Sequence, residues 1–269
     1  MPHSPIAAAS LALCRRCRFI IPLAGAASLS VAAAGYSDEV DARDLLQRMS
    51  SYLESEASFG FDFDEYHEVV TTDGERLGLA SSGRVAVTRP DRLMVERTTG
   101  FTETGVTFDG QLLSVFDEAS GLSAEVVLAG DIDDLVDTLR NDFGRPLPAA
   151  DLLANAPHDG LMETVTEVKD LGAGVVSGVV CDHLALRAED VDWQIWIARG
   201  DTPYPCMLVI TTRDVEHLPQ YRVTVSEWRS GDGEVTAPDV AADTTPVSID
   251  RFLDGARVFP DNYSLEPQK

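Results

Sequence analysis

The sequence predicts a mainly β (α+β) fold, in which a curled antiparallel sheet or half-barrel carries an N-terminal helix and short helices over its concave face. Three observations lead to this prediction. Apolar residues alternate with polar ones from Phe59 onward, as in a half-buried strand. Asp-Gly pairs stand between strand-like segments, which is a hairpin signal. The helical segments between the strands are short and amphipathic, so they need a sheet to cover, and one domain fits better than two.

Residues 1–35 have the pattern of a secretory signal peptide. Arg15, Arg16 and Arg18 form a basic start, residues 19–31 an apolar stretch, and a group of alanines a cleavage site near Ala33–Gly35. The apolar stretch is shorter than the about 20 residues that a membrane-spanning helix needs. We therefore expect export to the periplasm, by either the Sec or the Tat route.

The remaining residues, 36–269, are expected to form a single domain with a less ordered acidic tail from about residue 231. The net charge of the chain is −24, and loss of a leader with three arginines and no acidic residue would lower it to −27. Such a charge repels phosphate backbones, which argues against nucleic acid as a partner. No apolar run long enough to span a membrane remains after the leader.

The first helix is expected from Glu39 to Glu54, after a cap at Ser37 or Asp38. Its apolar residues recur at helical spacing, so one face should be buried. These residues are Leu45, Leu46, Met49 and Leu53.

Antiparallel strands are expected to follow, up to about Leu128. Asp73-Gly74 and Asp109-Gly110 lie between strand-like runs, where a type I′ turn needs positive φ at both central residues. A helix capped by Asp131, a helical turn near Pro148 and a short apolar piece come next. The helix after Asp131 places four apolar residues on one face: Ile132, Leu135, Val136 and Leu139. The short apolar piece contains Leu161, Met162 and Val165. Strands then return at about 174–187, 191–199, 205–213 and 220–228.

The stretch "VDWQIWIARGD" sets the register of the last strands. Odd spacing on a strand sends Trp193 and Trp196 to opposite faces. Turns on either side of this stretch predict one apolar face, made of Leu184, Leu186, Trp193, Ile195, Ile197, Cys206, Leu208 and Ile210. The reverse face is mixed and holds His183, Ala185, Arg187, Gln194, Trp196, Met207 and Thr211.

Two cysteines, Cys181 and Cys206, remain once the leader is removed. In the predicted register they lie on opposite faces of strands that a third strand separates. Their Cα atoms would then exceed the roughly 7 Å limit for a disulfide. The sequence therefore predicts two free thiols, unless a bulge shifts the register.

No common catalytic signature occurs, so an enzyme is not expected, and neither a metal nor a cofactor is predicted. His67 shares a strand face with Glu65 and could act as a general base for hydrolysis. A strand-end histidine near water explains it more simply. Asp62 and Asp64 alternate with phenylalanines, which marks them as a solvated face rather than cation ligands.

Five strings in order, "RDLLQRMSSYL", "SSGRVAVTRPDRLMVER", "FDGQLLSVFD", "GRPLPAADLL" and "VDWQIWI", resemble a family of predicted periplasmic proteins, domain of unknown function 2092. The resemblance covers about Asp41 to Trp228. This family looks related to the LolA and LolB lipoprotein carriers. The resemblance implies an antiparallel half-barrel whose apolar concave face can hold acyl chains, and it supplies no catalytic residues.

The leading hypothesis is an exported protein that binds or carries an apolar ligand, a lipid or a lipoprotein acyl chain, in a cavity between sheet and helices. The candidate lining residues are Phe59, Phe61, Phe63, Leu135, Leu139, Leu184, Leu186, Trp193, Ile195, Leu208 and Ile210. The alternative is a non-enzymatic cell-envelope interaction or scaffold module that docks a protein partner through Trp196 and Met207.

Overall fold

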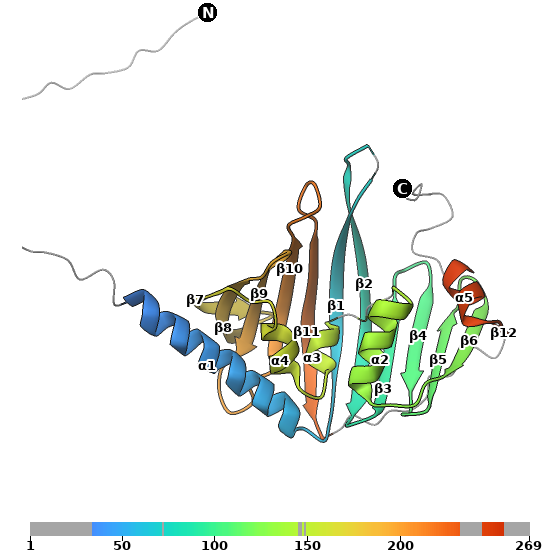
Figure 1. Ribbon diagram of the computed structural model, residues 1–269, viewed down its shortest axis with the longest axis horizontal. Helices are drawn as coiled ribbons and strands as arrows, with labels where there is room; N and C mark the ends of the chain where they lie inside the picture. The colour runs from blue at the N-terminus through green and yellow to red at the C-terminus, as the bar shows by residue number, and fades with distance from the viewer. Residues whose placement is uncertain (1–33, 72, 145–146, 148, 232–243, 256–269) are drawn as a thin grey trace, which may run out of the picture.

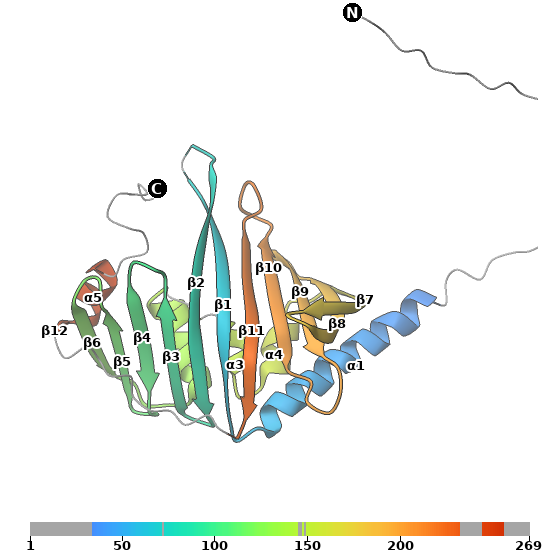
Figure 2. The same ribbon diagram turned by 180° about the vertical axis from the view of Figure 1, so that it is seen from behind.

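The computed structural model describes residues 34–71, 73–144, 147, 149–231 and 244–255. Nearly all of the expected leader lies outside these residues. The described chain forms one twelve-stranded sheet that curls without closing, with the helices in its concave side (Figures 1 and 2). The predicted α+β half-barrel is therefore confirmed.

The strands follow the order β12-β6-β5-β4-β3-β2-β1-β11-β10-β9-β8-β7 across the sheet. All neighbours run antiparallel except β12 and β6, which are parallel. The strand bounds are β1 Ser58–Val70, β2 Arg76–Thr88, β3 Arg92–Thr98, β4 Glu103–Phe108, β5 Leu112–Asp117, β6 Leu122–Val127, β7 Glu167–Val176, β8 Val179–Arg187, β9 Val191–Ala198, β10 Pro205–Thr212, β11 Gln220–Ser230 and β12 Thr245–Pro246. The two Asp-Gly pairs lie between β1 and β2 and between β4 and β5, as the sequence predicts. The predicted type I′ turn is wrong, because Gly74 and Gly110 have positive φ (85° and 88°) but Asp73 and Asp109 do not.

Helix α1, Ala34–Ser55, confirms the predicted N-terminal helix and begins a turn earlier than expected. It crosses the strands β7 to β9 with one apolar face turned to the sheet (Figure 1). Leu46, Met49 and Leu53 are fully or almost fully buried on that face. The indole Nε1 of Trp228 on β11 donates a hydrogen bond of 3.0 Å to the hydroxyl of Tyr52, which ties α1 to the sheet.

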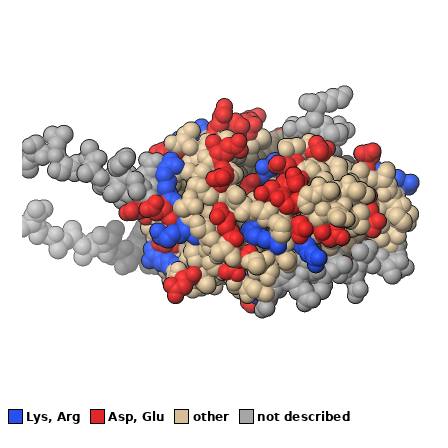
Figure 3. Space-filling view, turned by 60° about the horizontal axis from the view of Figure 1, so that its bottom comes forward, with Lys and Arg blue, Asp and Glu red and all other residues tan. Residues whose placement is uncertain are grey.

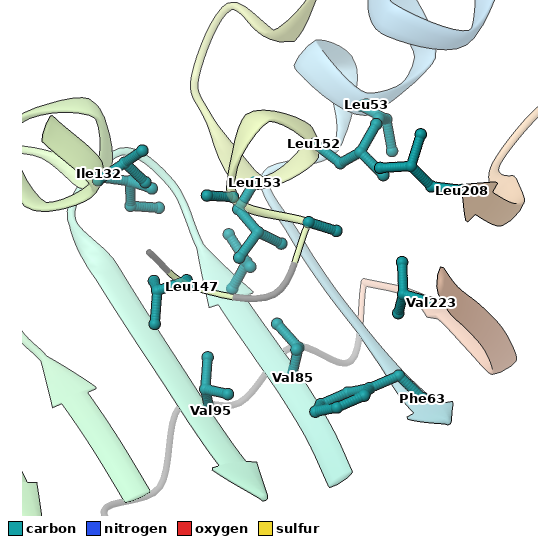
Figure 4. Packing of buried hydrophobic residues seen from close by; sticks show 14 of the residues in the cluster. Leu53, Phe63, Val85, Val95, Ile132, Leu147, Leu152, Leu153, Leu208 and Val223 are labelled. Atoms are coloured by element: carbon teal, nitrogen blue, oxygen red, sulfur yellow. The ribbon is translucent and has the colours of Figure 1, made fainter. Parts of the chain in front are cut away.

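The central helices are α2 (Ile132–Asp137), a π-helical turn η1 (Thr138–Asp142), α3 (Ala150–Leu153) and α4 (Pro157–Met162). The predicted cap holds, since the side chain of Asp131 accepts hydrogen bonds from the backbone N–H groups of Asp133 and Asp134. Leu152 and Leu153 of α3 point into the space between α1 and the strands, where Leu152 approaches Leu53 and Leu208 (Figure 4). The buried apolar residues of these helices belong to the main hydrophobic core.

The single strand predicted at 174–187 is wrong, because the structure has two strands there, β7 and β8. They meet at Ser177 and Gly178, whose φ angles are 48° and 86°. Positive φ at both central residues is the signature of a type I′ hairpin turn. Valines stand on both sides of this Ser-Gly turn, so the sequence has the pattern of one continuous apolar strand.

The predicted register of the last strands is confirmed for its core pairs, with Leu186 opposite Trp193, Leu184 opposite Ile195 and Ile210 opposite Trp193. The placement of Cys206 is wrong. A β-bulge between Pro205 and Met207 shifts the register of β10 by one residue, and Cys206 is the extra residue. The bulge turns Cys206 away from the concave core and into a small buried cluster with Cys181.

Part of the segment expected to be a tail forms secondary structure against the sheet edge. Thr245 of β12 pairs with Leu122, and helix α5 (Ile249–Gly255) packs on β6. Phe252 of α5 is buried in the main core. Residues 232–243 and 256–269 of that segment lie outside the described residues.

Candidate functional site

A cavity of about 520 Å³ lies in the concave side of the sheet, in the half that α1 does not cover. Its walls come from β1, β3, β4, β5, β10 and β11, and η1, the start of α3 and α5 also contribute side chains to its lining. This volume falls within the roughly 300–1,000 Å³ typical of small-molecule sites. The concave side of the sheet thus holds a hollow next to its buried apolar core.

Most of the cavity wall is apolar. Val95, Val106 and Val115 stand side by side on β3, β4 and β5, because the register pairs Val95 with Val106 and Val106 with Val115. The other apolar side chains of the wall are Leu113, Phe116, Leu139, Phe143, Leu147, Leu208, Ile210, Ile249, Phe252 and Leu253. Aliphatic and aromatic groups from four strands, from η1 and α5, and from the segment after η1 therefore converge on one space.

Polar groups reach the cavity from β1, from its neighbour β11, and from β3, which β2 separates from β1. Glu65 and His67 follow Phe63 on the same face of β1, and Arg97 and Tyr221 come from β3 and β11. Burial, and then the negative charge of Glu65, raise the pKa of the Tyr221 hydroxyl well above its usual range, so it is neutral. The His67 side chain is exposed, yet partial loss of water around the imidazole lowers its pKa, so its neutral form is favoured.

The residues that the sequence predicts for the lining fall into two groups. Leu139, Leu208 and Ile210 border the cavity. The other eight lie buried in the main core: Phe59, Phe61, Phe63, Leu135, Leu184, Leu186, Trp193 and Ile195. The prediction that these eight line a cavity is wrong, because their side chains pack against one another and against the helices in the core.

Trp196 and Met207, predicted for partner docking, lie on the reverse face of the sheet and are half-buried. The Trp196 ring stacks on the ring of His183, with centroids 3.9 Å apart and 14° between the planes. It also covers Gly174, where a Cβ atom would lie 2.6 Å from the indole. Trp196 is therefore held by its neighbours on β7 and β8.

Several residues that line the cavity were not predicted from the sequence. Arg97 shares a strand face with Leu93 and Val95, so period two was a usable signal for an inward-facing arginine. Phe252 and Leu253 approach the cavity from α5, which the sequence places in the tail. Nothing local in the sequence indicates that contact.

A second hollow of about 420 Å³ lies between α1 and the turn after β9. Polar and charged side chains contribute much of its wall, including Gln47, Arg48, Asp182, Arg199 and Asp201. It lacks the converging apolar groups of the cavity. The cavity is therefore the better candidate for holding a ligand.

The surface carries charges of both signs. On the face shown in Figure 3, acidic and basic side chains are interspersed among neutral residues. None of the helices in the described part of the chain is long and apolar enough to cross a membrane. Within the same residues, no group of three or more His, Cys, Asp or Glu side chains is placed to hold a metal ion.

Comparison with solved structures finds similar folds at low identity. The lipoprotein LppX of Mycobacterium tuberculosis is 13% identical, with 71% of this chain and 96% of that chain covered and a TM-score of 0.43. MucB, in the MucA/MucB complex of Pseudomonas aeruginosa, is 17% identical, with 78% and 64% covered and a TM-score of 0.40. A LolA superfamily protein of Nitrosomonas europaea is 11% identical, with 71% and 94% covered and a TM-score of 0.36. None of the curated proteins matches the chain.

The family resemblance drawn from the five sequence strings is confirmed. The sequence profile described as "Predicted periplasmic protein (DUF2092)" matches residues 42–239, which is more than half of the chain and nearly all of the sheet. The chain belongs to this family of predicted periplasmic proteins.

Proposed function

We propose that this protein binds or carries the apolar part of a lipid or of an acylated protein in the cavity between the sheet and η1, α3 and α5. The observation that supports the proposal is the contrast within one concave face. Buried side chains fill part of this face, whereas another part leaves about 520 Å³ lined mostly by aliphatic and aromatic side chains. A protein that needed only a stable core would gain by filling that space.

Burial is a sufficient source of affinity for such a ligand. Each CH₂ group moved from water into an apolar wall contributes about 0.8 kcal/mol. The wall formed by Val95, Val106 and Val115 offers apolar contact without a reacting group, which suits a carrier. No covalent chemistry is needed to hold or to release the ligand.

The polar end of the cavity suits the head of an amphiphile. Glu65, His67 and Arg97 present both hydrogen-bond donors and hydrogen-bond acceptors at one place in an otherwise mostly apolar wall. In this arrangement the acyl chain lies against β3 to β5, and the head lies toward β1 and β11. The family description as predicted periplasmic supports a setting in which lipids and lipoproteins are at hand.

A pair of tryptophan variants tests the proposal. Val106→Trp adds an indole inside the cavity, whereas Val127→Trp adds the same group at a site that is 86% exposed, at the end of β6. The probe is a fluorescent fatty acid, and native mass spectrometry of protein purified from its own periplasm detects any lipid retained. We expect bound lipid in the wild type, and at least a tenfold loss of probe affinity for Val106→Trp with Val127→Trp unchanged.

Two outcomes would overturn the proposal: wild-type protein without lipid or probe binding, or equal binding by Val106→Trp and the wild type when both are folded by circular dichroism. If the wild-type protein binds neither lipid nor probe, the interaction-module hypothesis is favoured. The reverse face around Trp196 then becomes the surface to test with envelope proteins.

A further inference from the structure

The bulge in β10 brings the two mature cysteines together. Cys181 on β8 stands opposite Ala198 of β9, and so shares the reverse face of the sheet with Trp196. Met207 also stands opposite Trp196, and the extra residue before it, Cys206, turns to the same side. The two thiols thus meet across β9, although the regular register would keep them apart.

The sulfur atoms of Cys181 and Cys206 lie 2.8 Å apart. A disulfide bond is about 2.03–2.05 Å long, so a shift of less than one ångström would bring the two sulfur atoms to bonding distance. Cys181 is 0% exposed and Cys206 1% exposed. Their apolar surroundings are Val176 and Ala198, with Val179, Trp196, Tyr204 and Met207 packed against them.

We propose that Cys181 and Cys206 form an intrachain disulfide that fastens β8 to β10 across β9 once the chain reaches an oxidising compartment. The predicted leader and the periplasmic family description place the chain in such a compartment. This inference does not depend on what the cavity holds.

The chemistry is thiol–disulfide exchange with an oxidised disulfide compound or protein, RS–SR. One cysteine thiolate attacks RS–SR and releases one RS⁻ as a mixed disulfide forms. The second cysteine thiolate then attacks the mixed disulfide and releases the other RS⁻. The two cysteines lose two protons and two electrons in total, and RS–SR leaves as two RSH.

Burial determines when this exchange can occur. Loss of water raises the pKa of both thiols, most strongly that of Cys206, so the thiolate is scarce in the folded chain. Thiol–disulfide exchange should therefore occur before folding buries the two cysteines. Once the chain has folded, the same burial shields the bond from reductants.

The disulfide would act on the wall of the cavity. Cys206 stands two residues before Leu208 on β10, and Leu208 and Ile210 both line the cavity. Fixing the bulge fixes the position of this strand relative to β8. The covalent tie thus lies outside the cavity, on the reverse face, and stiffens one of its walls.

The experiment uses the full chain exported by a bacterial host and collected without reductant. The protein is unfolded in guanidinium, treated with iodoacetamide, and its intact mass is measured with and without prior reduction. We expect no alkylation before reduction, two alkylated cysteines after it, and a peptide containing both Cys181 and Cys206 in the unreduced digest. Reduction should lower the Tm by roughly 5–15 °C, the range that a disulfide implies for a domain of this size.

Single variants provide the matched control. Cys181→Ser and Cys206→Ser should each show one cysteine that alkylates without reduction, and neither should show a reduction-dependent change in Tm. The proposal is overturned if both cysteines of the exported wild type alkylate without reduction. It is equally overturned if the unreduced protein is a covalent dimer.

Discussion

Nη1 of Arg89 lies 2.8 Å from the carbonyl oxygen of Ala154, the residue after the last one of α3. The same guanidinium donates to the carbonyl oxygen of Leu153 at 3.2 Å and, through Nε, to that of Leu53 in α1 at 3.3 Å. Its Cζ atom lies 5.4 Å from the centre of the Phe59 ring. One side chain at the end of β2 therefore fastens two helices to the sheet.

Replacing Arg89 should destabilise the fold. Arg89→Met leaves the carbonyl oxygens of Leu53 and Leu153 without their charged donor, at an expected cost of about 2–4 kcal/mol in the free energy of unfolding. Arg89→Lys keeps the charge but cannot reach all the acceptors, so an intermediate loss is expected. Urea unfolding followed by circular dichroism measures both.

The control is Arg187→Met, which removes an arginine from a more exposed ion pair with Asp192. Exposed pairs contribute little, so the expected change is below about 1 kcal/mol. Equal losses for the Arg89 and Arg187 variants would contradict the role given to Arg89.

Gly83 on β2 leaves room for the ring of Phe63. A Cβ atom at this position would overlap both that ring and the carbonyl oxygen of Glu96. We expect Gly83→Val to lower the free energy of unfolding by at least about 1–3 kcal/mol, the usual cost of overpacking. Gly160→Ala is the matched control, because nothing lies within 4 Å of a Cβ there and the residue is helical. It should stabilise by about 0.5–1 kcal/mol.

His67 should titrate below its ordinary pKa of 6.5, because partial loss of water disfavours the imidazolium. The unfolded chain then binds more protons than the folded one at pH values between the lowered pKa and 6.5. Stability is therefore fully present above 6.5 and falls as the pH is lowered through the folded pKa. NMR titration of the ring proton measures the pKa, and His67→Gln should remove this part of the pH dependence.

An occupied cavity should lower the pKa of His67 further, since an apolar ligand displaces water near the ring. A titration with and without a bound fatty acid compares the two states. A pKa above 6.5 in the free protein would contradict the desolvation that the structure indicates.

Trp196 should stabilise the fold as well as form part of the surface on the reverse face of the sheet. Trp196→Ala removes the stacking on His183 and uncovers Gly174 and the cysteine cluster. For a half-buried indole we expect a loss of about 2 kcal/mol. Trp196→Phe keeps a ring over His183 and should lose less, and thermal unfolding separates the two. A stable Trp196→Ala variant would instead favour a pure docking role for this side chain.

The sequence predicted the strands around Trp193 correctly because the turns at both ends of β9 fix its register. Period two then sends Leu186, Trp193 and Ile210 to one face without knowledge of the rest of the fold. The bulge at Cys206 has no comparable signature. A single inserted residue leaves the apolar pattern intact while it reverses one side chain.

The cavity was harder to predict than the sheet. Its existence depends on where η1, α3 and α5 pack, and these contacts join segments far apart in the chain. Leu139 could be placed on an inward face from helical spacing alone. Phe252 could not, because the sequence between β11 and α5 gives no indication of where α5 packs.

In the middle of the sheet, a strand from near the start of the domain pairs with a strand from near its end. Ser226 Oγ donates to the carbonyl oxygen of Asp62, between β11 and β1, across 164 residues of sequence. The β1–β11 ladder therefore cannot form until almost the whole chain has been made. Such a high contact order predicts slow folding, in which the halves assemble separately and join last. A chain of this topology cannot complete its sheet before β11 has been synthesised, so the two halves of the sheet stay unjoined until the chain is nearly finished.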